Sequence, residues 1–175
     1  KLSFAKLRMA EDLLLSDSAY GIGAGIFYLG YILFEIPSNL YMQRVGARRT
    51  ITRIMLLWGM VTVATAFVTT ANQLIAARFL LGVAEAGFFP GIILYMTYWL
   101  PASLRGRVTA GLLMAGMVAG IICGPLSGVI MAHLDGWLGF KDWQMLFILT
   151  GAPTLLLGLF GWFWLTDRPE QSNWL

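Results

Sequence analysis

The chain has 175 residues, of which 58% are hydrophobic and only 12% are charged. This composition, with a mean hydropathy of +0.74, excludes an ordinary soluble globular domain and predicts an all-α membrane protein. The formal net charge of +3 lies largely in short arginine-bearing loops, so it does not call for a nucleic-acid partner. The single cysteine, Cys123, and the single histidine, His133, provide no disulfide framework and no metal-ligand spacing, so we expect no metal and no cofactor.

In chain order, the apolar stretches predict five complete membrane spans. Residues 1–17 are too short and too charged to span, and we expect them to be the end of a helix and an external loop. The spans are predicted at 18–42, 54–70, 73–100, 108–132 and 144–165. Basic loops at 43–53 and 101–107 and a mixed-charge loop at 134–143 connect them, and residues 166–175 leave the membrane.

The arginines indicate the orientation of the spans. They are concentrated in 43–53, in 101–107 and at Arg168, and all three places fall on one side if the five spans alternate. Basic residues in short loops favour the cytoplasmic side. The first residue then lies outside, so one further helix is expected before it.

The stretch 73–100 is almost wholly apolar and carries two charges, Arg78 and Glu85. Seven residues apart on a helix, they share one face and are separated axially by about 10 Å. A charge at bilayer depth costs roughly 2.5–3.5 kcal/mol even on the mildest scale, so such residues normally line a cavity or pair. Glu85 is too deep to reach the headgroups, which indicates either a proton-carrying acid or a structural acid paired permanently with an arginine. Arg78 is nearer the outer end and either serves function or extends to the interface.

Other spans carry features with a local physical meaning. Glu35, just before Pro37, is a second intramembrane acid, which we interpret as a structural or gating partner for a loop arginine. The fourth span has glycines at fourfold spacing, which lets a neighbouring helix approach closely, and a proline that bends the helix: Gly116, Gly120, Gly124, Pro125 and Gly128. The tryptophans are expected in interfacial belts: Trp58, Trp99, Trp137, Trp143, Trp162 and Trp164.

Two segments, GYILFEIPSNLYMQRVGARR (30–49) and RFLLGVAEAGFFPGIILYMTYWLPASLRGR (78–107), resemble the anion:cation symporter family of the major facilitator superfamily. Two more, LDGWLGFKDWQMLFILTGAP (134–153) and LTDRPEQSNWL (165–175), resemble its bacterial organic-acid branch, which includes tartrate, galactonate, phthalate and 4-hydroxyphenylacetate permeases. The resemblance implies twelve helices in two six-helix halves, with the substrate held between them at the midplane. This chain would be helices two to six, in the bacterial inner membrane. Its partners would be a small organic anion, protons, the lipid bilayer and the C-terminal half.

The resemblance also implies roles for individual residues. Glu85 matches the acid that takes the coupling proton, and Arg78 matches the arginine that serves the substrate site or neutralises that acid. Tyr31 matches a tyrosine that faces the substrate. The cytoplasmic loop that latches the two halves in the outward-facing state corresponds to Arg44, Gly46 and Arg48.

The sequence departs from the family pattern at a few positions. Gln43 and Ala47 stand where the loop pattern has aspartate and arginine, which argues against a latch based on a carboxylate. Thr150 replaces a glutamate found in many relatives. Gly116 stands where a sugar-acid transporter has a substrate-binding glutamine, which weakens the case for a sugar acid.

Proton-coupled uptake of an organic anion is the function that these features favour, but other classes stay open. GxxxGPxxG (120–128) resembles a superfamily motif associated with exchange, so an anion exchanger is the alternative of the same fold. An intramembrane enzyme would need a serine–histidine pair, two deep aspartates or a zinc motif such as HExxH, and the sequence has none within its spans. A membrane scaffold without transport would leave Glu85 buried and unresponsive to pH.

Overall fold

The structure, a computed structural model, describes residues 2–165, and every regular element among these residues is helical. This confirms the prediction of an all-α protein. The elements are α1 Leu2–Asp12, α2 Asp17–Val45, α3 Ala47–Thr65, α4 Ala71–Glu85, α5 Phe88–Trp99, α6 Ala102–His133, the 3-10 helix η1 Trp137–Gly139, and α7 Asp142–Trp164. The predicted exit from the membrane at 166–175 lies outside the described residues.

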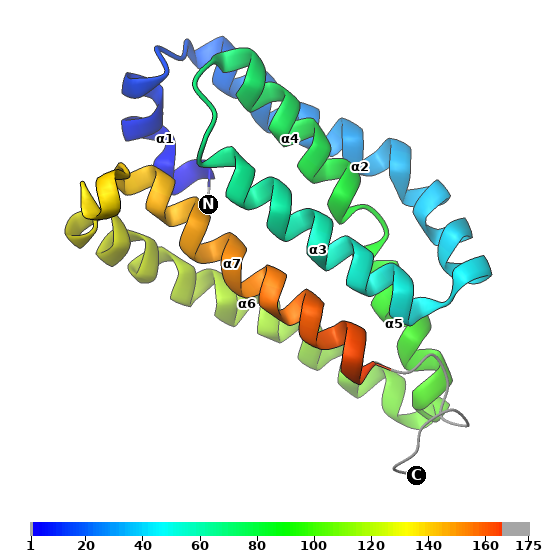
Figure 1. The fold of residues 1–175 in the computed structure, drawn as a ribbon. Helices are drawn as coiled ribbons and strands as arrows, with labels where there is room; N and C mark the ends of the chain where they lie inside the picture. The colour runs from blue at the N-terminus through cyan, green and yellow to red at the C-terminus, as the bar shows by residue number, and fades with distance from the viewer. Residues whose placement is uncertain (1, 166–175) are drawn as a thin grey trace.

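The helices run back and forth between the two ends of a bundle (Figure 1). The first end contains α1, the start of α2, and the turn between α6 and α7. The second end contains the end of α2, the start of α3, the end of α5 and the start of α6. The segments 43–53 and 101–107, expected as basic loops on one side, therefore lie at the same end. Most of their residues are helical, because Gly46 alone separates α2 from α3 and α6 begins directly after Pro101.

The limits of α2 follow from its flanking residues. Ser16 accepts a hydrogen bond on Oγ from the amide of Ala19, 3.1 Å away, and so caps the helix. At the other end Gly46 has a φ of 97°, a conformation that residues with a side chain rarely adopt. Its amide donates to the carbonyl of Met42 at 2.9 Å, which closes the last turn before the chain reverses into α3.

Glycines allow α3 and α7 to pack closely along much of their length. A Cβ placed on Gly59 would lie 2.7 Å from Cγ of Leu155, and one on Gly151 would lie 2.7 Å from Cγ2 of Val63. Contacts this short do not occur between real side chains, so only glycine permits this interface. A close helix approach was instead expected at the glycines of the predicted span 108–132, which lie on α6.

Glycines also allow α2 and α4, the two helices that carry the charged residues, to pack closely. A Cβ on Gly30 would lie 2.6 Å from the carbonyl oxygen of Phe79, and one on Gly82 would overlap the carbonyl of Phe27. Backbone therefore meets backbone where α2 and α4 cross. This crossing places Arg78 and Glu85, on either side of Gly82, against α2.

The predicted span 73–100 is not one continuous helix. After Glu85, Ala86 takes an extended ψ of 129° and Gly87 takes a φ of 83°, and a new helix begins at Phe88. Gly87 is confined there, because an added Cβ would lie 2.6 Å from Oγ of Ser38 on α2. Glu85 is consequently the last residue of α4 and lies directly beside a break in the span.

Four stretches of the described chain are long and apolar enough to cross a membrane: Asp17–Val45, Ala71–Trp99, Ala102–His133 and Asp142–Trp164. α3 is shorter and begins with three arginines in its first seven residues. It nevertheless packs against α7 and α4, and to a smaller extent against α5 and α2, so it runs beside three of those four stretches. The assignment of 54–70 as a span stays a prediction.

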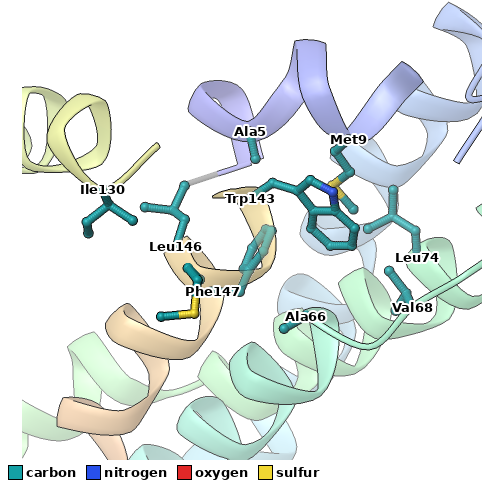
Figure 2. Close-up of a cluster of buried hydrophobic side chains, with 10 residues drawn as sticks. Ala5, Met9, Ala66, Val68, Leu74, Ile130, Trp143, Leu146 and Phe147 are labelled. Atoms are coloured by element: carbon teal, nitrogen blue, oxygen red, sulfur yellow. The ribbon is translucent and has the colours of Figure 1, made fainter. Parts of the chain in front are cut away.

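A cluster of buried side chains joins the helices at the first end of the bundle (Figure 2). Trp143 of α7 is 2% exposed and lies among residues of α1, α4 and the α3–α4 connection, including Met9, Leu74 and Ala66. The expectation that this tryptophan belongs to an interfacial belt is wrong, because helix α1 covers it. Its indole Nε1 donates to Oδ2 of Asp12 at 2.7 Å, which satisfies the one polar atom of the ring.

Candidate functional site

The side chain of Arg78 is held against α2 by a backbone carbonyl and an aromatic ring of that helix. Its Nε donates to the carbonyl oxygen of Gly23 at 3.3 Å, and its guanidinium carbon lies 4.9 Å from the centroid of the Phe27 ring. The side chain is partly buried. Arg78 therefore does not extend freely toward the headgroups, and its fork is oriented by α2.

Glu85 lies two turns further along α4 and is also partly buried. It interacts electrostatically with Arg78, so the two charges of this span are coupled. The same acid interacts with Tyr31 of α2. Arg78 and Glu85, expected on one helical face from their spacing of seven, therefore both lie between α2 and α4.

Tyr31 and Glu35 extend this environment along α2. They are four residues apart, on the same helical face as Phe27, and the Phe27 and Tyr31 rings lie 6.3 Å apart. Both Glu35 and Glu85 act electrostatically on Tyr31. The structure brings Arg78, Glu85, Tyr31 and Glu35 together around one helix crossing, and their roles stay predictions.

The three predicted loop residues lie far from that crossing, at the second end of the bundle. Arg44 is exposed in the last turn of α2, and Gly46 makes the reversal into α3. Arg48 turns toward α7, where both Nε and a terminal nitrogen donate to the carbonyl oxygen of Trp162. Its guanidinium also lies 5.6 Å from the Trp162 ring centroid, so Arg48 joins α3 to α7.

The glycine series of α6 faces open space. A Cβ on Gly116, Gly120 or Gly128 would meet no other atom of the described chain within 4 Å. Pro125 is exposed, and α6 continues through it as a single helix. Gly124 is partly exposed on the same helix. Within residues 2–165, Gly116, Gly120 and Gly128 therefore have no helix to pack against, and the packing role of the series stays a prediction.

Arg53 was not predicted as a site residue, because in the sequence it falls among the loop residues 43–53. Arg53 lies in the second turn of α3, donates a hydrogen bond to Oγ of Ser38 at 3.2 Å, and stacks 4.4 Å from the Tyr41 ring centroid. Since Ser38 also contacts the position of Gly87, Arg53 links α3 to the part of α2 that supports the break in the span. The four-residue spacing of Arg49 and Arg53 was the only signal for such a role.

In the described part of the chain, no three histidine, cysteine, aspartate or glutamate side chains are grouped so that they could hold a metal ion. The charged residues of the site lie on two apolar helices, with Arg78 and Glu85 on α4 and Glu35 on α2. Such a bundle of membrane-length helices with charged side chains inside its spans defines a multi-pass membrane protein.

Comparison with known proteins gives the family. The sequence model of the Major Facilitator Superfamily matches residues 2–174. The chain is 50% identical, over 99% of its length, to a protein of Agrobacterium vitis whose name assigns it tartrate transport. It is 48% identical over the same share to a protein of Pseudomonas putida named for metabolite transport, NicT. The chain spans 40% of the length of each of these two relatives.

Solved structures agree with the fold. A bacterial homologue of the human lysosomal transporter Spinster, in an inward-facing and unoccupied conformation, superposes with a TM-score of 0.74 at 21% identity. The match covers 98% of this chain and 40% of that one. The chain therefore belongs to the Major Facilitator Superfamily, a family of membrane transporters and not of enzymes. This confirms the resemblance that 30–49 and 78–107 indicated, and the relative named for tartrate transport agrees with the organic-acid branch.

Proposed function

We propose that the chain forms helices two to six, within the N-terminal half, of a secondary transporter of the bacterial inner membrane, which takes up a small organic anion with protons. The names of the two relatives, for tartrate and metabolite transport, support this class of substrate. Because the chain spans 40% of those relatives, the remaining helices would supply the other wall of the substrate site. Rocking of the two halves would expose the site alternately to each side of the membrane.

The observation that carries the proposal is the coupled pair Arg78 and Glu85 inside one apolar span. Both are partly buried against α2, and their charges interact. Charged groups at bilayer depth are expensive and mark ion or substrate pathways by default. An arginine suits an anionic substrate, and an acid beside it suits a proton.

Arg78 is the group that binds the substrate carboxylate. Its Nε is committed to the carbonyl of Gly23, which holds the guanidinium plane against Phe27. The terminal nitrogens form the part of the fork that a carboxylate engages with two parallel hydrogen bonds. Because one hydrogen bond already orients the fork, little side-chain freedom is lost when the anion binds.

Glu85 is the group that carries the proton. A substrate carboxylate on Arg78 competes with Glu85 for the same positive charge, so binding of the anion favours neutralisation of Glu85 by a proton. Release of the substrate returns Arg78 to Glu85 and expels that proton. This reciprocal competition couples anion to proton without contact between the two cargoes.

Tyr31 and Glu35 complete the site from α2. Tyr31 lies between Arg78 and Glu35 along the helix face and offers a hydroxyl to a polar substrate group. Glu35 is one turn closer to the arginine-rich end, where it would gate access from that side. The loop residues Arg44, Gly46 and Arg48 would latch this half to the other one.

Uptake by the intact transporter in proteoliposomes tests the proposal. With an inward proton gradient, the wild-type protein should accumulate a labelled dicarboxylate such as tartrate, whereas Glu85→Gln should lose accumulation and keep counterflow. Glu11→Gln, which removes an exposed acid of α1 outside the membrane-length helices, is the control and should still accumulate substrate. Accumulation by Glu85→Gln at the wild-type level would disprove the coupling role.

An anion exchanger is the second candidate, since the GxxxGPxxG motif lies on a face of α6 that the described chain leaves uncovered. The exchanger requires internal counter-substrate and functions without a proton gradient. Uptake that survives collapse of the gradient but needs preloaded substrate would select this alternative.

A further inference from the structure

A groove lies along one side of α3 toward the arginine-rich end of the bundle, away from the α2–α4 crossing. It has a volume of about 250 Å³ and is bordered on the far side by Trp162 of α7. Its other lining residues come from a single helix: Arg49, Thr52, Arg53, Leu56, Leu57 and Met60. No part of the site around Arg78 and Glu85 contributes to it.

The lining of the groove changes along its axis from charged to apolar. Arg49 and Arg53 lie on one face near the start of α3, and Leu56, Leu57 and Met60 continue that face toward the middle of the helix. From Arg49 to Met60 the helix rises about 16 Å. A cationic end followed by an apolar channel has the same order as a phospholipid, whose phosphate lies at the interface and whose chains point inward.

Two polar groups at the charged end have no hydrogen-bond partner among the described residues. Thr52, which is 1% exposed and lines the groove, has an unsatisfied hydroxyl, and Arg53 has an unsatisfied Nε. Buried polar groups are nearly always satisfied, so such atoms indicate a partner that the described residues do not supply. A phosphate ester has the acceptor oxygens that both groups lack.

The remaining contacts keep the end of the groove rigid. Arg48 binds the carbonyl of Trp162 and so fixes the far wall against α3, while Arg53 is anchored by Ser38 and Tyr41. Arg49 is exposed and projects its charge at the mouth. An arginine that is exposed beside a preformed apolar channel suits an anionic headgroup better than a neutral one.

We infer that this groove binds one anionic phospholipid, such as phosphatidylglycerol, from the leaflet at the arginine-rich end. Arg49 and Arg53 hold the phosphate, Thr52 donates its hydroxyl, and Leu56, Leu57 and Met60 contact one acyl chain. Trp162 closes the groove at interface depth, where its amphipathic ring is favoured. The lipid would then stabilise the α3–α7 pair independently of the substrate.

Native mass spectrometry of the intact protein in detergent tests the inference, with phosphatidylglycerol and phosphatidylcholine of identical acyl chains as probes. The wild-type protein should retain one phosphatidylglycerol with about fivefold higher affinity than phosphatidylcholine, the preference expected for one arginine near the membrane surface. Arg49→Gln should abolish that preference. Arg107→Gln, which removes an exposed arginine of α6 at the same end, should preserve it.

A second variant tests the acyl-chain part without changing any charge. Leu57 is exposed, so Leu57→Trp can fill the groove without disturbing the packed side of α3, and retention of both lipids should fall. Inorganic phosphate at millimolar concentration should not displace phosphatidylglycerol, because it has no acyl chain. A preference for phosphatidylglycerol that survives Arg49→Gln, unchanged retention in Leu57→Trp, or displacement by inorganic phosphate would each overturn the assignment.

Discussion

Arg78 donates a hydrogen bond from Nε to the carbonyl oxygen of Gly23, 3.3 Å away on a different helix. Gly23 is buried, and a Cβ placed on it would only touch Cγ of Arg78 at 4.0 Å, so the arginine stem lies directly against α2. The bond uses the inner nitrogen of the guanidinium and leaves the outer edge of the fork pointing away from that carbonyl. Arg78 is therefore an oriented group within the span, not a mobile charge.

This orientation predicts that lysine cannot replace Arg78. An ammonium group has no second, fixed pair of donors, so Arg78→Lys keeps the charge but loses either the Gly23 anchor or the two-point contact with a carboxylate. We expect the substrate Kd of the intact transporter to rise about tenfold, the loss of a charge-assisted hydrogen bond. Isothermal titration calorimetry with the transported anion measures this Kd. Arg107→Lys is the control, and equal affinities for Arg78→Lys and wild type would contradict the substrate role.

Stability should depend on the glycines at the α2–α4 crossing. Gly30→Ala places a methyl group 2.6 Å from the carbonyl oxygen of Phe79, which is backbone and cannot move aside, and overpacking of this kind costs about 1–3 kcal/mol. Gly25→Ala on the same helix is the matched control, because nothing lies within 4 Å of its position. Thermal unfolding in detergent should show a lower Tm for Gly30→Ala only. A similar Tm for both variants would contradict the close crossing.

The stability of the fold should decrease at acidic pH because of Asp12, which lies at the first end of the bundle. Burial raises the pKa of this carboxyl, but hydrogen bonds from Lys141 and Trp143 and the charges of Lys141 and Arg8 outweigh burial, so the pKa lies below its usual 3.8. A depressed folded-state pKa means that the ionised carboxylate stabilises the fold above pH 3.8, and that this contribution is lost as the pH falls through the folded-state pKa. Asp12 lies outside the membrane-spanning segments, so bulk pH controls it directly.

Asp12→Asn should remove this pH dependence. The wild-type protein should lose thermal stability progressively as the pH falls below about 5, while the variant should be less stable at neutral pH and change less on acidification. Asp17→Asn, which alters an exposed acid at the start of α2, is the control. Parallel acid profiles for wild type and Asp12→Asn would show that the contacts of Asp12 contribute nothing.

The sequence predicted the helical architecture well because apolar length and arginine placement act over whole segments. Arg78 and Glu85 could be placed on one face because the spacing of seven depends only on helix geometry. The cover over Trp143 could not be predicted, since it depends on how α1 folds back over α7. Arg53 was missed for a related reason: its position in the second turn of α3 required knowing that Gly46 alone makes the preceding turn.

The break between α4 and α5 has a signal in the sequence that the predicted span 73–100 did not use. Pro90 has no N–H to donate to the carbonyl of Ala86, and its ring clashes with that carbonyl, so a continuous helix is disfavoured there. The tertiary contact adds a second constraint, because Ser38 lies where a side chain of residue 87 would be, so the break also requires glycine there. Glu85 then ends a helix instead of lying inside one. The surroundings of the acid are therefore set by α2 as well as by its own span.

The break leads to a prediction about transport. Gly87→Ala adds a Cβ 2.6 Å from Oγ of Ser38 at a residue whose φ is 83°, so both the local backbone and the α2 contact are strained. Since Glu85 is two residues away, we expect the variant to lower proton-driven uptake by about tenfold, which corresponds to about 1.4 kcal/mol of strain. Combining it with Ser38→Ala removes only the contact with Oγ, because Cβ of Ser38 would still lie 2.8 Å from the added Cβ. Gly111→Ala, at an open position of α6, serves as the control for a harmless glycine substitution. Uptake by Gly87→Ala at the level of Gly111→Ala, in protein of equal Tm, would show that the geometry of the break does not affect the coupling acid.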